Sequence, residues 1–271
     1  MIPAFVTHFG LKALPFSKEV ADGDLWIPSS KKGLVDELAD ALRERSSVLL
    51  TGDPGVGKTC VLRMLRHTLP NAGFRLTYCH NATLGRRDFY RQLCLALGLS
   101  PSATAAAVFW MVSTHIQDLG REQLHPVFLL DEAHLLHQDT LDHLHILLNY
   151  EWDSRALLSL VLVGLPELST RLEMRRNRSL YSRVHCRLAI SPATPADTAE
   201  YVAHRLGQVG SDRELFTTDA VAMLHESASG SLRDVDRLAI AAMREAARKK
   251  RKLIERDVLA RVIDAENHVD P

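Results

Sequence analysis

The chain has 271 residues, enough for one large domain or for an α/β core with a smaller second domain. Hydrophobic residues make up 46% and charged residues 24% of the sequence, which is ordinary for a soluble globular protein. Basic and acidic residues number 33 each, so net charge indicates no highly charged partner, and a nucleic-acid surface would have to arise from local clustering.

The cysteines and the N-terminus indicate where the protein resides. The four cysteines are far apart and form no C-x-x-C pair, which suits a reducing cytoplasm and argues against a disulfide framework or a zinc site. Residues 1–5 lack the basic and apolar regions of a signal peptide. No apolar run approaches the roughly 20 residues that a membrane span needs. We therefore expect a soluble cytoplasmic protein without membrane insertion.

The first 45 residues predict an extension followed by a helix. Residues 1–30 carry aromatic residues and prolines without clear periodicity, and we expect an extended segment that packs on the core. Simple packing and a role in covering a nucleotide base are both open for it. Residues 31–45 predict a helix with Leu34, Leu38 and Leu42 on one face.

Strand and helix patterns then alternate from residue 46 to residue 190. The predicted strands are Val48–Thr51, Phe74–Cys79, Pro126–Leu130, Leu157–Val163 and Val184–Ile190. The predicted helices between them are Thr59–Leu69, Asp88–Leu97, 103–119 and 139–150. This alternation predicts a parallel sheet flanked by helices.

A turn-rich boundary at Ser191–Pro195 precedes a region with helical patterns only. These helices are expected at 196–207, 218–228, 231–249 and 255–265. We therefore divide the chain into an extension (1–30), an α/β domain (31–191) and a small helical domain (192–271).

A glycine-rich segment follows the first predicted strand and opens the next helix. It fits the pattern G-x-x-x-x-G-K-[ST] from Gly52 to Thr59. Such a loop turns backbone N–H groups around the phosphates of a nucleotide, and the helix N-terminus adds positive charge. Lys58 can reach the β- and γ-phosphates, and the Thr59 hydroxyl can bind Mg²⁺. A glycine-rich turn without a ligand is the alternative, against which the flanking strand and helix argue. The expected nucleotide contacts are Gly52, Asp53, Pro54, Gly55, Val56, Gly57, Lys58, Thr59 and Cys60.

Two acids end the apolar strand at Pro126–Leu130. Asp131 and Glu132 would stand at the carboxyl edge of a parallel sheet, where α/β proteins bind ligands. Asp131 would hold Mg²⁺ through its water shell, and Glu132 would orient the attacking water and accept its proton. Acids often end strands, but the preceding lysine loop makes the pair a candidate hydrolysis site.

These two motifs followed by a helical domain resemble the AAA+ ATPases, which implies ATP as the nucleotide. Gly230-Ser231-Leu232-Arg233 looks like the family's sensor 2 motif, whose arginine reaches the γ-phosphate. Arg183 looks like the arginine finger, which acts on the nucleotide of a neighbouring subunit. For both arginines a surface ion pair is the alternative. The resemblance thus adds Arg183 and Arg233 to Lys58 and Glu132 as catalytic candidates and implies an ATP-dependent homo-oligomer, a ring or a filament.

One family position is not matched. The family carries a polar residue, sensor 1, after its fourth core strand, but this chain has Gly164 and Leu165 there. Hydrolysis would then be slow, or another side chain would substitute, and Asn149 is one candidate. Four histidines also cluster at His134, His137, His143 and His145, without completing a metal-binding signature.

Further fragments resemble one branch of the superfamily, which holds the ExeA-type secretion ATPases and the TniB and TnsC-like transposition helpers. Examples are Phe9-Gly10-Leu11, Asp131–Leu136 and Leu162–Leu168. The secretion members continue into a membrane span and a peptidoglycan-binding domain, which we do not find before Pro271. We therefore expect a transposition helper that binds duplex DNA with ATP and works with a transposase or other recombination protein. The alternatives are a secretion-assembly ATPase and a slowly hydrolysing nucleotide switch.

Two basic clusters are candidates for contact with DNA. Residues 171–187 contain six arginines and one acid, and 248–252 is an unbroken basic run. Such clusters attract phosphates without base specificity. For the second cluster, a solvated helix end favoured by the helix dipole is an equal alternative. The candidate DNA contacts are Arg175, Arg176, Arg178, Arg248, Lys249, Lys250, Arg251 and Lys252.

Overall fold

The computed structural model describes residues 3–79, 83–100, 104–150, 154–211 and 213–267. The start of the predicted helix at 103 and the last four residues of the predicted helical domain lie outside these ranges. The chain forms two compact units, and each is described by itself. The helical unit comprises residues 1–31, 53–57 and 191–271, and the α/β unit comprises residues 32–52 and 58–190.

The α/β unit contains a five-stranded sheet in the order β2-β3-β4-β1-β5, with every neighbouring pair parallel. The strands are β1 (Ser47–Gly52), β2 (Phe74–Cys79), β3 (His125–Leu130), β4 (Ser159–Gly164) and β5 (Val184–Ile190). The helices are α2 (Lys32–Arg43), α3 (Lys58–Thr68), α4 (Arg86–Ala96), α5 (Ala105–Arg121), α6 (Gln138–Leu147), α7 (Glu167–Glu173) and α8 (Arg178–Tyr181), with 3-10 turns η3 (Ala133–Leu135) and η4 (Arg175–Asn177).

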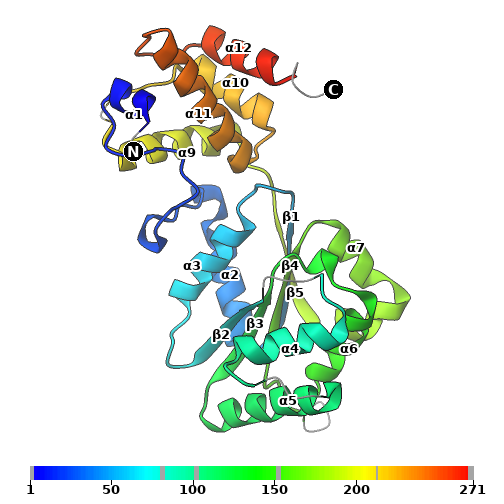
Figure 1. The fold of residues 1–271 in the computed structure, drawn as a ribbon. Coiled ribbons are helices and arrows are strands. Elements are labelled where there is room, and N and C mark those ends of the chain that lie inside the picture. Colours follow the sequence, from blue (N-terminus) through cyan, green and yellow to red (C-terminus); the bar gives the residue numbers. More distant parts are fainter. Residues whose placement is uncertain (1–2, 80–82, 101–103, 151–153, 212, 268–271) are drawn as a thin grey trace. The chain divides into compact units, whose positions relative to one another are not determined.

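Helices cover both faces of this sheet. Strands β1, β3 and β4 are buried at every position, as expected for central strands of a parallel sheet. Side chains alternate between the faces, so Leu49, Phe128 and Leu162 join the hydrophobic cluster of α4, α5 and α6. Figure 1 shows α2 and α3 together on the other face, where both contact β1.

The helical unit is built from the C-terminal helices and the N-terminal segment. Its elements are α1 (Ala4–Phe9), α9 (Pro195–Gln208), α10 (Thr218–Ala228), α11 (Leu232–Arg248) and α12 (Arg256–Asn267), with 3-10 turns η1 (Asp22–Asp24) and η2 (Ser29–Lys31). Helix α1 packs against α11, and Phe5, Val6, Leu11 and Phe16 are buried among the C-terminal helices.

The N-terminal segment therefore differs from the expectation. We expected residues 1–30 to be extended and to pack on the α/β core, whereas the segment begins with α1 and joins the helical unit. A buried arginine ties it there, because Arg205 donates from Nε to the Pro15 carbonyl at 2.8 Å and from Nη2 to the Ser17 carbonyl at 2.7 Å. The apolar side chains of residues 1–30 follow no regular period, so the sequence did not show that this segment packs against the C-terminal helices.

The remaining elements agree closely with the patterns of the sequence. Each predicted strand is present with its ends shifted by at most two residues. Helices α1, α7 and α8 are not indicated by the sequence, because helices of four to seven residues are too short to reveal a 3.6-residue period. Among the described helices, none combines the length and apolar character needed to cross a lipid bilayer.

Candidate nucleotide site

The lysine of the glycine-rich loop stands at the carboxyl edge of the sheet. Strand β1 ends at Gly52, and α3 begins at Lys58. Gly55 and Gly57 take φ of +80° and +101°, values that strain any residue with a side chain. Lys58 is 8% exposed, and its Nζ donates a hydrogen bond of 2.7 Å to the Gly52 carbonyl. The ammonium group is therefore held against the loop, while the Thr59 side chain beside it is exposed.

The middle of the loop belongs to the helical unit and lies against the start of α11. A methyl group added to Gly55 would collide with the Ser231 side chain and would lie 3.1 Å from Cβ of Arg233. Ser231 caps α11 by accepting a hydrogen bond from the Asp234 N–H. Arg233, which is exposed, thus emerges beside the loop that is expected to bind phosphate. This proximity fits the role expected from the sensor 2 resemblance.

Asp131 follows β3 at the same sheet edge as Lys58, with β4 between β3 and β1. Its carboxylate is 5% exposed and fixed on both oxygens. Oδ1 accepts from the Glu132 N–H at 2.9 Å, and Oδ2 accepts from the Tyr78 hydroxyl at 2.8 Å. Partial burial and then this hydrogen bond raise the pKa of Tyr78, so the phenol stays a donor. Tyr78 was not identified from the sequence. It comes to Asp131 through the register between β2 and β3, which no sequence pattern reveals.

Glu132 has a strained backbone and an exposed carboxylate. Its φ of +53° lies in the left-handed region, which costs a residue with a side chain roughly 1–2 kcal/mol. Strain of this kind clusters at functional sites. Its Oε2 lies 3.5 Å from Nδ1 of His134, a neighbour not expected from the sequence. Asn149, one candidate substitute for sensor 1, follows α6, which leads away from this edge toward the start of β4.

The residues present fit a nucleotide with Mg²⁺. The glycine-rich loop follows β1, and a buried lysine and a buried carboxylate stand at one sheet edge. Asp131 and Thr59 would hold Mg²⁺, which would neutralise charge on the β- and γ-phosphate oxygens. Lys58 would bind the same oxygens, and Glu132 would take a proton from water.

Arg183 lies at the opposite edge of the sheet. It precedes β5, and the next residue, Val184, aligns with Ser47 at the amino end of β1. The length of β1, about 17 Å at roughly 3.3 Å per residue, separates Arg183 from the lysine loop of its own chain. Arg183 Nη1 donates to the Ser179 carbonyl at 3.0 Å. The structure does not bring this residue to the other site residues of the same chain.

The two basic clusters differ in their surroundings. Arg175, Arg176 and Arg178 are exposed around η4 and the start of α8, and Arg176 pairs with Asp142 at 3.0 Å. In the second cluster, acids accompany most of the cations. Arg248 and Lys249 both pair with Glu245, Arg251 pairs with Asp257 and Glu255, and Lys252 donates to the His8 carbonyl. Lys250 is exposed in the turn after α11.

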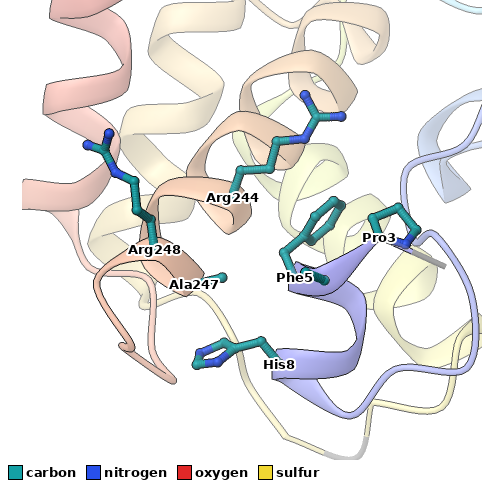
Figure 2. Close-up of a pocket in the computed structure, with 7 residues that line it drawn as sticks. Pro3, Phe5, His8, Arg244, Ala247 and Arg248 are labelled. Carbon is teal, nitrogen blue, oxygen red and sulfur yellow. The ribbon is translucent and has the colours of Figure 1, made fainter.

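A recess of the helical unit borders the second cluster (Figure 2). It lies between α1 and α11, and the Arg244 guanidinium lies 5.7 Å from the centre of the Phe5 ring. Its lining residues are Pro3, Ala4, Phe5, His8, Arg244, Ala247 and Arg248. None of the expected nucleotide contacts is among them, so this recess is separate from the candidate site.

Comparison with known proteins agrees with this geometry. Residues 40–172 match the family described as AAA domain. The chain is also 31% identical over 261 residues to the general secretion pathway protein A of Aeromonas hydrophila, across 94% of this chain and 47% of that protein. The chain thus spans about half the length of this relative, and the match bears out the resemblance to the branch that includes the secretion ATPases.

Solved structures share the fold. Cdc6p from Pyrobaculum aerophilum has a TM-score of 0.70 at 17% identity over 89% of this chain and 67% of its own. The Drosophila ORC bound to DNA has a TM-score of 0.70 at 18% identity, over 97% of this chain and 65% of its own. The Thermotoga maritima RuvB Holliday junction branch migration motor has a TM-score of 0.60 at 18% identity, over 93% of this chain and 73% of its own. At such identities the likeness shows a shared fold and nothing finer.

Proposed function

We propose that this protein hydrolyses ATP with Mg²⁺ and assembles with copies of itself when ATP is bound. The observation that carries the proposal is that the buried Lys58 and the fixed Asp131 stand at one edge of the sheet, within the residues that match the AAA domain family. Glu132 beside them is the base for the attacking water. ATP and four cysteines that form no disulfide fit a location in the cytoplasm.

The placement of the two arginines supports assembly. Arg233 stands beside the loop of its own chain, where it would contact the γ-phosphate. Arg183 stands at the far edge of the sheet, too distant for its own nucleotide, and would therefore serve a neighbouring subunit. Each complete site would then need two copies of the chain, which makes nucleotide binding and assembly interdependent.

Turnover and assembly together test this proposal. Purified protein should release phosphate from ATP with Mg²⁺, and Glu132→Gln should bind ATP normally while lowering kcat at least 100-fold. Light scattering should show larger assemblies with ATP than with ADP. A wild-type protein that binds no nucleotide, or turnover that Glu132→Gln leaves unchanged, would contradict the assignment.

For the output of the ATP cycle, the first candidate is duplex DNA, in the role of a transposition helper. The exposed Arg175, Arg176 and Arg178 lie within a short stretch of the α/β unit. The ion pair of Arg176 with Asp142 is solvent-exposed and therefore weak, so phosphates can compete for it. Such a cluster would bind the DNA backbone without base specificity. A transposase or other recombination protein would be the protein partner.

Salt-dependent binding to a DNA duplex tests this candidate. With ATP, Arg175→Glu/Arg178→Glu should weaken binding at least tenfold and reduce the slope of log affinity against log salt by about two. The matched control, Arg248→Glu/Lys250→Glu, changes charge equally in the cluster that acids accompany and should have a smaller effect. Binding that is insensitive to ATP, or equal in the two variants, would argue against this surface.

The second candidate is assembly of a secretion complex, which the general secretion relative favours. The output would then be a protein contact, and duplex DNA should change neither turnover nor assembly. Neighbouring genes that encode a transposase would favour the first candidate, and a secretion operon would favour the second.

A further inference from the structure

The end of β4 lacks the polar side chain that AAA+ proteins carry there, and an imidazole fills the space. Gly164 is buried, and a Cβ added to it would lie 2.9 Å from Cδ2 of Leu168. The same atom would lie 3.2 Å from both the backbone N and Nδ1 of His134. A side chain at 164 would therefore be tight against both Leu168 and the His134 ring, which would have to shift by a few tenths of an ångström. Glycine at this position leaves room for the imidazole at the sheet edge.

His134 is held firmly, whereas its neighbour Glu132 is not. The His134 side chain is 11% exposed and that of Glu132 is 51% exposed. The turn that carries His134 is anchored, because Arg171 Nη1 donates to the His134 carbonyl at 2.9 Å and Arg171 also donates to Gln138. An exposed carboxylate samples several rotamers, so a fixed donor beside it would hold it in one of them.

Two groups face the same ring nitrogen of His134. Nδ1 lies 3.5 Å from Glu132 Oε2, and the Leu165 N–H points to it at 3.4 Å. With its proton on Nε2, the ring accepts from Leu165. With a proton on Nδ1, it donates to Glu132. Both distances are long, as is common for catalytic hydrogen bonds before substrate binds.

We propose that His134 is the positioning residue for Glu132 and takes the place of the polar side chain that Gly164 and Leu165 do not provide. This inference rests on the proposed hydrolysis of ATP. In the tautomer with the proton on Nδ1, which gives up the bond from the Leu165 N–H, the ring would hold the Glu132 carboxylate toward the attacking water, and that water then loses its proton to Glu132. His134 itself neither accepts that proton nor binds the phosphates through Nδ1.

Substitutions at 134 test this positioning role. His134→Ala should lower kcat at least tenfold, while KM for ATP and the affinity for a fluorescent ADP analogue change less than threefold. His134→Asn should recover part of kcat, because the asparagine amide stands where Nδ1 stands. His134→Gln, whose amide reaches the Nε2 position, should recover less. In the Glu132→Gln background, His134→Ala should cause no further fall, because the group that it positions is already lost.

Gly164→Ala gives an independent arm of the test. The added methyl group would press on the imidazole and on Leu168, so kcat should fall in the same direction as in His134→Ala, with ADP-analogue binding retained. If the wild type is active and His134→Ala has an unchanged kcat, the positioning role of His134 is overturned while the proposed hydrolysis of ATP stands. Equal recovery of kcat by His134→Asn and His134→Gln would have the same meaning. An inactive wild type would overturn the proposed function as well. If His134→Ala loses nucleotide binding, the comparison of the asparagine and glutamine variants decides.

Discussion

Lys58 and Asp131 place ionisable groups that are 8% and 5% exposed at the carboxyl edge of the sheet. Such groups are retained when hydrogen bonds or opposite charges compensate for their lost hydration. Asp131 has this compensation from Tyr78 and from the Glu132 N–H, and Lys58 has it from the Gly52 carbonyl. Both charged groups are thereby held in place at this edge of the sheet.

Loss of the lysine should therefore remove phosphate binding. We expect Lys58→Ala to weaken binding of a fluorescent ATP analogue at least tenfold, because one charge-assisted contact to the phosphates is worth more than about 1.4 kcal/mol in a desolvated site. Arg66→Ala, which removes an exposed cation from the same helix, is the control and should bind as the wild type does. Equal binding by Lys58→Ala would contradict the assignment of the loop.

His125 predicts a pH dependence of stability in the α/β unit. Burial, and then the charge of Arg45, lower the pKa of His125 to about 4, against about 6.5 for an exposed histidine. The folded chain keeps the ring neutral, with Nε2 2.8 Å from Ser159 Oγ. Between about pH 6.5 and about pH 4 the unfolded chain binds a proton that the folded chain does not. The free energy of unfolding should therefore fall as pH decreases through this window, by up to about 3 kcal/mol.

Substitution isolates this contribution. His125→Gln can keep a hydrogen bond to Ser159 without titrating, so its stability in urea should fall less than that of the wild type between about pH 7.5 and about pH 5. His185→Gln, at an exposed position of β5, is the matched control and should follow the wild type. Identical pH profiles for all three proteins would refute the role of His125.

At the scale of elements, the sequence predicts the strands that form from long apolar runs and the links that form from glycine-rich turns. The apolar run Pro126–Leu130 predicted a strand, and β3 contains it and is buried at every position. Gly52–Thr59 forms the expected link from β1 to α3. Contacts between distant segments were not predictable, because no pattern couples Tyr78 to Asp131 or Gly164 to His134. The unmatched polar position at 164 left two expectations from the sequence, slow hydrolysis or a substitute side chain.

Helix α9 begins with a reciprocal cap that can be tested. Thr194 Oγ1 accepts from the Asp197 N–H at 3.1 Å, and Asp197 Oδ2 accepts from the Thr194 N–H at 2.9 Å. Thr194→Ala should lower the free energy of unfolding by about 1 kcal/mol, as measured by chemical denaturation, whereas Thr194→Ser should keep most of it. Equal stability of the alanine and serine variants would mean that the cap does not contribute.

At the scale of the molecule, the N-terminal segment packs with helices that lie far from it in the sequence. Residues 1–31 precede the α/β unit in the chain but share the hydrophobic core of the C-terminal helices. The loop 53–57 groups with the same helices, through Gly55 beside Ser231.

The position of Arg183 predicts that one subunit completes the site of another. Arg183→Ala and Glu132→Gln should each lower turnover at least tenfold, since one removes the arginine and the other the base. Mixed in equal amounts, the two variants should regain activity, because some interfaces join an intact Glu132 to an intact Arg183. Random assembly makes about a quarter of the interfaces productive. A mixture of Lys58→Ala with Glu132→Gln is the control and should stay inactive, because both defects lie in the nucleotide site. If the first mixture is also no more active than the average of its parts, Arg183 does not act in trans.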